Sequence, residues 1–189
     1  LMIRTILCLL VVGPATLLAG TGQTRVATVS WELKFRFQDP QRVSVILPGR
    51  SEPVVYWYML YSVENSSNRE VDFFPEFTLL TDTMRVLKSE VLVSPEAFQA
   101  IRRRSGLTVL LSPEKVAGRL LRGEDQAKHG VAIWRDFDSA AKGFKIYVSG
   151  LSSEAAFLKN PAYDPGRPED DSNKKAFLLR KTLEIPYRL

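Results

Sequence analysis

The chain has 189 residues, of which 25% are charged, and a formal net charge of +5. This length suffices for one globular domain, and the mild positive charge is compatible with anionic partners without being evidence for them. A single cysteine, Cys8, and a single histidine, His129, exclude a disulfide framework and argue against thiol catalysis and against zinc, copper or haem sites. We expect no cofactor and no metal.

Residues 1–20 have the organisation of a secretory signal. Arg4 precedes an apolar run over residues 6–19, and small residues follow it, as is typical of such signals. The run is shorter than the roughly 20 residues that a membrane-spanning helix needs. We predict cleavage near Ala19 or Gly20, no stable transmembrane span afterwards, and a periplasmic, cell-surface or extracellular location. An uncleaved membrane anchor is the alternative.

Residues 21–28 are predicted to be a linker, and residues 29–189 a single domain. A first strand is expected over residues 29–38, where apolar side chains occupy every second position, and a second over 42–47. The alternating apolar side chains of the first strand are Trp31, Leu33, Phe35 and Phe37.

The run Val54–Val63 is the most apolar segment after the signal. It is rich in aromatic and β-branched residues and is followed by a polar turn, so it is predicted to be a central strand. Residues 71–80 alternate with period two, and the two runs are predicted to pair as an antiparallel hairpin. Pro75 would then lie at an edge or a bulge. The aromatic residues are interpreted as core, with a ligand-stacking platform as the alternative.

The middle of the chain is predicted to be helical. Ser94-Pro95-Glu96 and Ser112-Pro113-Glu114 each combine an N-cap residue, a proline at the first helical position and an early acid. We expect helices over 95–104 and from 113 to Gly123. Residues 84–93 are predicted to form weaker strands or an irregular connection.

The C-terminal part returns to strands. These are expected over 130–137 and 144–151, joined by a hairpin-type loop, and over 176–187 after a polar surface loop at 160–173. Leu189 directly follows a strand-like run, so truncation at the C-terminus is part of the interpretation. No helices alternate with the strands. The predicted fold class is therefore mainly β, an immunoglobulin-like antiparallel β-sandwich with one or two short helices in a connection.

Four segments also carry a resemblance, which would extend over most of the domain. Tyr56–Asn65, Val71–Phe77, Gly130–Trp134 and Tyr147–Leu151 together resemble uncharacterised exported proteins of planctomycete-type bacteria. The resemblance implies export but carries no named activity, so it transfers no functional residue.

The sequence contains no strong pattern of catalytic residues. His129 would have to serve any Ser-His-Asp triad, and no Gly-x-Ser-x-Gly elbow is present. The acids near Asp164 and Asp170 are interpreted as a solvated loop, with calcium binding or paired carboxylates for glycoside hydrolysis as alternatives. No catalytic residue is predicted.

Two basic runs are the candidate interaction residues. They are Arg102, Arg103, Arg104, Lys174 and Lys175. The arginines end a predicted helix, where cations favour the dipole, and contact with an anionic polymer, lipid headgroup or protein is the functional interpretation. Nucleic acid is not expected as a partner of an exported protein.

The sequence thus predicts an exported, non-catalytic structural or protein-interaction module of the cell envelope, with an envelope protein or polymer as partner. A carbohydrate- or anionic-polymer-binding module is the first alternative, supported if aromatic residues are exposed on one sheet face. An unrecognised hydrolase is the second, supported by a cleft that holds carboxylates with raised pKa values.

Overall fold

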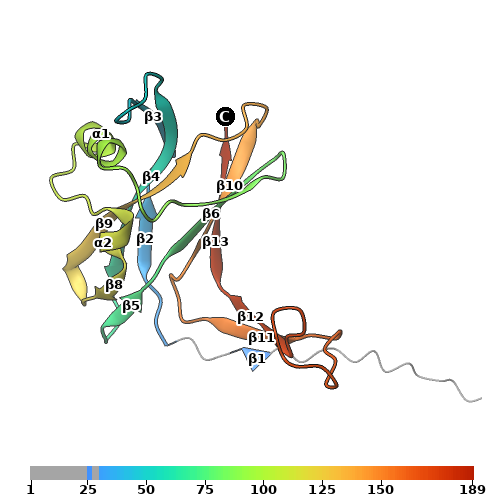
Figure 1. The fold of residues 1–189 in the computed structure, drawn as a ribbon. Coiled ribbons are helices and arrows are strands. Elements are labelled where there is room, and N and C mark those ends of the chain that lie inside the picture. The colour runs from blue at the N-terminus through green and yellow to red at the C-terminus, as the bar shows by residue number, and fades with distance from the viewer. Residues whose placement is uncertain (1–24, 27–29) are drawn as a thin grey trace, which may run out of the picture.

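The computed structural model describes residues 25–26 and 30–189, which form antiparallel sheets and two short helices (Figure 1). The predicted signal, residues 1–20, and most of the predicted linker lie outside the described residues. The strands are β1 (Arg25–Val26), β2 (Lys34–Phe37), β3 (Gln41–Val45), β4 (Val54–Asn65), β5 (Val71–Phe73), β6 (Glu76–Thr81), β7 (Val86–Lys88), β8 (Gly118–Leu120), β9 (Gly123–Arg135), β10 (Gly143–Ser149), β11 (Ala155–Lys159), β12 (Ala176–Arg180) and β13 (Thr182–Arg188). The helices are α1 (Pro95–Ser105) and α2 (Pro113–Val116).

The first sheet is built around β4. Strands β2 and β3 pair with successive halves of one edge of β4, and β9 pairs with the other edge, with Trp57 opposite Trp134. Most side chains of β4 are buried, whichever face of the sheet they occupy. The central position predicted for this run is therefore confirmed.

The second sheet contains β13, β10, β6 and β7 in that order. Its inner face shares one apolar cluster with the first sheet, to which Phe77, Leu79 and Ile146 contribute from one side and Met59 and Trp134 from the other. All five are at most 5% exposed. Burying large apolar side chains is the main stabilising contribution available to a domain of this size.

Helix α1 covers the opposite face of the first sheet. Its buried residues Ala97 and Ile101 pack in a second apolar cluster with Tyr56, Tyr58 and Ile133. The helix begins as predicted, because the Ser94 hydroxyl accepts a hydrogen bond of 3.1 Å from the Ala97 amide. The first sheet is thus buried on both faces, by the helix and by the second sheet.

The predicted hairpin between residues 54–63 and 71–80 is wrong. Strand β4 pairs with β2, β3 and β9, whereas β6 pairs with β10 and β7. Both edges of β4 are occupied, so the chain after Asn65 crosses to the other sheet. Pro75, which cannot donate to a strand ladder, separates β5 from β6 within the run.

Two further predictions need correction. The loop at residues 138–143 does not close a hairpin, because β9 and β10 belong to different sheets. The second helix ends at Val116 instead of Gly123, and Gly118–Leu120 forms β8, which pairs with β5. Gly118 has a φ of 110°, a backbone conformation outside the helical region.

Beyond the end of the β10–β13 pair, strands β11 and β12 form a separate sheet with β1. We call this three-stranded sheet the arm. It lies at the lower right of Figure 1, on the side of the molecule away from α1. Arg25–Val26, which falls inside the predicted linker, supplies the third strand. The predicted strand over 176–187 divides at Lys181, and the predicted loop at 160–173 connects β11 to β12.

Candidate functional site

The three candidate arginines lie in the last turn of α1, as the sequence predicts. All three are exposed. Arg102 donates to the Thr108 carbonyl at 3.3 Å and Arg104 to the Arg42 carbonyl at 3.1 Å. These two guanidinium groups therefore tie the helix end to neighbouring segments.

The candidate lysines Lys174 and Lys175 lie far from α1, in the loop at the end of the arm (Figure 1). Lys174 forms an ion pair of 2.8 Å with Asp171, which raises the pKa of the lysine. The loop itself is organised by the buried Asn173, whose amide donates to carbonyls of three residues, Asp164, Arg167 and Pro168. The structure does not bring the two basic runs into one surface.

The tryptophans do not form a ligand-stacking platform. Trp57 is 7% exposed and Trp134 is 1% exposed, and both belong to the shared core. Trp31 is half-buried against the same cluster. Their burial removes the stacking surface that a carbohydrate-binding module of this kind would need.

A surface pocket of about 470 Å³ is lined by a group of three polar contacts centred on Asp136, Arg42 and Trp57. Asp136 accepts from Arg42 at 2.7 Å and from the Trp57 indole at 2.9 Å. The Arg42 guanidinium carbon also lies 5.5 Å from the Trp57 ring centroid. Because both carboxylate oxygens of Asp136 accept hydrogen bonds from neighbouring strands, we interpret this group as stabilising the fold.

The same pocket contains a second carboxylate, Asp138. A hydrogen bond from the Ala140 amide, and then one from Thr83, lower the pKa of this carboxyl. A general acid near neutral pH needs the opposite shift. The shift of Asp138 is therefore opposite to the one that the hydrolase alternative requires of a general acid.

His129 lies within β9, not in a loop before it, because that strand begins at Gly123. Its side chain is exposed. In residues 25–26 and 30–189, no three His, Cys, Asp or Glu side chains are grouped so that they could hold a metal ion. Nor does any helix in the described part of the chain have the length and apolar character to cross a membrane.

Five exposed large apolar side chains lie in the arm. In β11, Phe157 is 54% and Leu158 41% exposed; in β12, Phe177, Leu178 and Leu179 are 42%, 46% and 47% exposed. Isolated exposed apolar residues are ordinary, but a contiguous group marks an interaction surface in a soluble domain.

Strand register divides these side chains between two faces. Directly opposed residues share a face, and successive residues alternate. One face therefore presents Ala156, Leu158, Phe177 and Leu179, and we call it the apolar face. The other presents Ala155, Phe157, Lys159, Ala176, Leu178 and Arg180, and we call it the cationic face.

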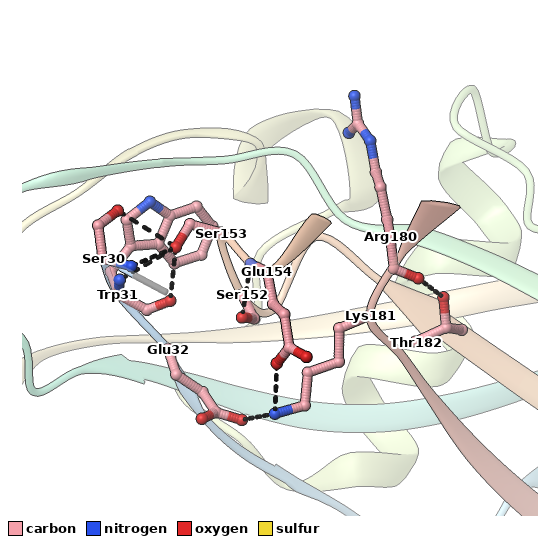
Figure 2. A network of polar contacts seen from close by, with 9 residues as sticks. All are labelled: Ser30, Trp31, Glu32, Ser152, Ser153, Glu154, Arg180, Lys181 and Thr182. Carbon is pink, nitrogen blue, oxygen red and sulfur yellow. Dashed lines mark hydrogen bonds and ion pairs between the residues drawn. The ribbon is translucent and has the colours of Figure 1, made fainter. Parts of the chain in front are cut away.

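A polar network fixes the base of the arm to the body, by which we mean the part of the domain outside the arm (Figure 2). The Ser153 hydroxyl accepts from the backbone amides of Ser30 and Trp31, at 2.8 and 3.1 Å. The Lys181 ammonium lies 3.0 Å from a Glu32 carboxylate oxygen and 3.3 Å from one of Glu154. Except for the Lys181–Glu154 pair, these contacts join residues more than a hundred positions apart, so they attach the arm to the N-terminal part of the domain.

The outer edge of the arm is the free side of β12, since the sheet order is β1-β11-β12. The Lys175 carbonyl accepts a hydrogen bond from the Asn160 amide, and the Lys181 amide donates one to the Glu154 carbonyl. Because these odd-numbered residues face β11, the even-numbered residues of β12 direct their backbone groups outward. Within the described chain no strand pairs with this edge. An open edge next to exposed apolar side chains is suited to binding an extended segment.

Sequence reasoning missed the arm as a site. Phe177-Leu178-Leu179 was predicted to be a strand, but its apolar residues were not distinguished from core. The available signal was the position of this run, between Lys175 and Arg180 and directly after a long polar loop.

The chain matches no protein-family model, no curated protein and no solved structure. The functional argument therefore rests on the geometry of the chain itself.

Proposed function

We propose that the protein is an exported, non-catalytic interaction module of the cell envelope, in which the folded body holds the arm as a binding element. The observation that carries the proposal is the exposed apolar face on β11 and β12. Three of the large side chains, Leu158, Phe177 and Leu179, form the apolar face, and the free edge of β12 lies beside them. An apolar extended segment of an envelope protein fits this combination.

The same proposal includes the finer fold and the location. We interpret the first and second sheets, with their shared core, as an immunoglobulin-like β-sandwich to which α1 and the arm are additions. The secretory signal predicted over residues 1–20 and the resemblance to exported proteins of planctomycete-type bacteria support a periplasmic, cell-surface or extracellular location.

The alternatives have less support. A carbohydrate-binding module would need several exposed aromatic rings on one sheet face, yet Trp57 and Trp134 are buried, and the two exposed rings of β11 and β12, Phe157 and Phe177, lie on opposite faces. A hydrolase would need a carboxyl with a raised pKa, and the pKa of Asp138 is lowered. Because cations lie at the end of α1, the experiment below includes binding of an anionic polymer among its outcomes.

Site-directed photo-cross-linking in the source organism tests the proposal. A photoreactive residue at position 177 is expected to give discrete protein adducts in the envelope fraction. The same residue at position 46 is the matched control, because Ile46 is 64% exposed but lies far along the chain from the arm. Adducts at position 46 as strong as those at 177, or none at 177, 158 and 179, would overturn the proposal. Recovery of glycan alone would favour a polymer-binding module.

A further inference from the structure

The cationic face of the arm has a composition unlike that of the apolar face. Phe157 and Leu178 stand opposite each other at its centre. Lys159 lies at one end of the face and Arg180 at the other, each paired in register with a small alanine. The face therefore consists of an apolar centre between two cations.

Among the described residues of β11 and β12, no acidic side chain shares this face. Lys159 and Arg180 are exposed, and neither has an ion-pair partner in the described part of the chain. Figure 2 shows the Arg180 side chain pointing away from the Glu32–Lys181–Glu154 cluster at the base of the arm. Since neither cation has an ion-pair partner and the two flank the apolar side chains of Phe157 and Leu178, the face is complementary to a surface in which anionic groups lie above an apolar layer.

The acids nearest in sequence are engaged with other groups. Glu184 pairs with Lys145 at 2.8 Å and Glu154 with Lys181 at 3.3 Å, and the acids of the loop at the end of the arm are engaged within that loop. Asp171 pairs with Lys174 at 2.8 Å, and Glu169 accepts from the Lys175 amide at 3.3 Å. Asp164 and Asp170 accept from amides two residues ahead, those of Gly166 and Ser172. None of these bonds reaches Lys159 or Arg180.

The position of β1 supplies a second, independent argument. Arg25 pairs in register with Phe157. The predicted apolar signal run ends at Ala19, so six Cα–Cα steps separate it from the arm. At 3.3–3.6 Å per residue, this connection spans at most about 20 Å. In the alternative in which this run is retained as a membrane anchor instead of being cleaved, the centre of the cationic face is held within that distance of the bilayer surface.

We propose that the cationic face of the arm docks on the surface of a bilayer that contains anionic phospholipids. Phe157 and Leu178 enter the boundary between headgroups and acyl chains, and Lys159 and Arg180 bind headgroup phosphates. The proposal rests on export, as proposed above, and deepens it. With the cationic face on the membrane, the apolar face and the edge of β12 point away from it, toward a protein partner.

Tryptophan quenching by lipids with brominated acyl chains tests this docking. The full chain is reconstituted into vesicles of phosphatidylcholine, with or without phosphatidylglycerol. Phe157→Trp reports on the cationic face, and Phe177→Trp is the matched control on the opposite face of the same strand pair. Signals are corrected for the parent chain, which already contains Trp31, Trp57 and Trp134.

The expected result is quenching of the residue introduced at 157, several-fold stronger than at 177, in vesicles with phosphatidylglycerol. High salt and the double change Lys159→Gln with Arg180→Gln should reduce it at least to the level found with phosphatidylcholine alone. Near-ultraviolet circular dichroism, which is sensitive to the buried Trp134, identifies any variant that has not folded.

Equal quenching at 157 and 177 would mean that the tether alone keeps the arm near the bilayer, and would overturn the proposal. So would quenching that survives loss of both cations, or no quenching at 157. If both positions were shielded from aqueous iodide in the absence of vesicles, a second copy of the chain would be covering the arm. That result would also overturn the proposal. The quenching needs no protein partner, so it can succeed when photo-cross-linking at 177 fails, and the reverse.

Discussion

Tyr61 on β4 and Phe77 on β6 face each other across the two sheets, with ring centroids 4.9 Å apart. Phe35 lies beside both rings, at 5.3 Å from Tyr61 and 6.3 Å from Phe77. The phenol of Tyr61 is buried among them, and desolvation raises its pKa. The two strands exchange no ladder bonds, so side-chain packing alone joins the sheets at this point.

Phe77→Ala should lower the free energy of unfolding by about 3–5 kcal/mol, because it leaves a cavity between the sheets. Phe74→Ala is the matched control. Phe77 is 5% exposed and Phe74 is 65% exposed, so the control should change stability by no more than about 0.5 kcal/mol. Urea unfolding followed by fluorescence measures both. Similar losses for the two variants would contradict the packing described.

Asp136→Ala removes the acceptor of the Trp57 indole and the partner of Arg42. A buried donor left without an acceptor costs about 1–3 kcal/mol. Asp136→Asn keeps an acceptor for Trp57 and should cost less. Asp39→Ala, at an exposed aspartate, controls for the loss of a negative charge. If Asp39→Ala lowered the free energy of unfolding as much as Asp136→Ala does, the contacts of Asp136 with Trp57 and Arg42 would not be the cause.

Lys181 gives the base of the arm a pH dependence. Its hydrogen bond to Glu32, followed by that to Glu154, raises the pKa of the ammonium above its ordinary value of 10.5. A raised pKa in the folded state means that the stabilisation is fully present below the ordinary value and is lost as the pH rises through the folded value.

Thermal melting of the parent chain should therefore show a loss of stability as the pH rises past about 10.5, and Lys181→Gln should lose less over the same interval. Lys159→Gln is the control, since Lys159 has no acidic partner among the described residues. If Lys159→Gln removed the pH dependence as well as Lys181→Gln does, the network at the base would not be its source.

Gly150→Ala should destabilise the junction between β10 and the arm. Gly150 has a φ of 85°, and an added Cβ would lie 2.6 Å from the Phe74 carbonyl oxygen. Gly49→Ala is the control, because Gly49 has a φ of 75° with no atom within 4 Å of an added Cβ. The control should cost about 1 kcal/mol from backbone strain alone. Gly150→Ala should cost clearly more, and equal losses in differential scanning calorimetry would exclude the clash.

The sequence predicted single elements better than their pairing. Ser94 and Pro95 located the start of α1, and the uniformly apolar run of β4 indicated a strand buried on both faces. Alternation shows which side chains are buried but not what they pack against. Residues 71–80 therefore fitted a hairpin with β4 equally well, although Phe77 and Leu79 approach β4 from the opposite sheet.

The interaction surface was harder to predict for a related reason. Hydrophobicity marks Leu178 in the same way as it marks a core residue such as Leu79, and only the fold distinguishes 46% exposure from 0%. The basic runs were visible in the sequence, but Arg102 and Arg104 proved to bind backbone carbonyls. Lys159 and Arg180 stand out only once the strand register places them around Phe157.

The long-range strand pairing of the core also bears on how the chain reaches its destination. Strand β4 gains its main partner only when β9 has been made, and Ile185 of β13 completes the cluster between the sheets. Contacts this distant along the chain close slowly. During synthesis the N-terminal half therefore has no finished core to fold onto, and we expect it to remain extended until most of the chain has left the ribosome. If the protein is exported, as we propose, this delay keeps the chain in a form that a translocation channel can accept.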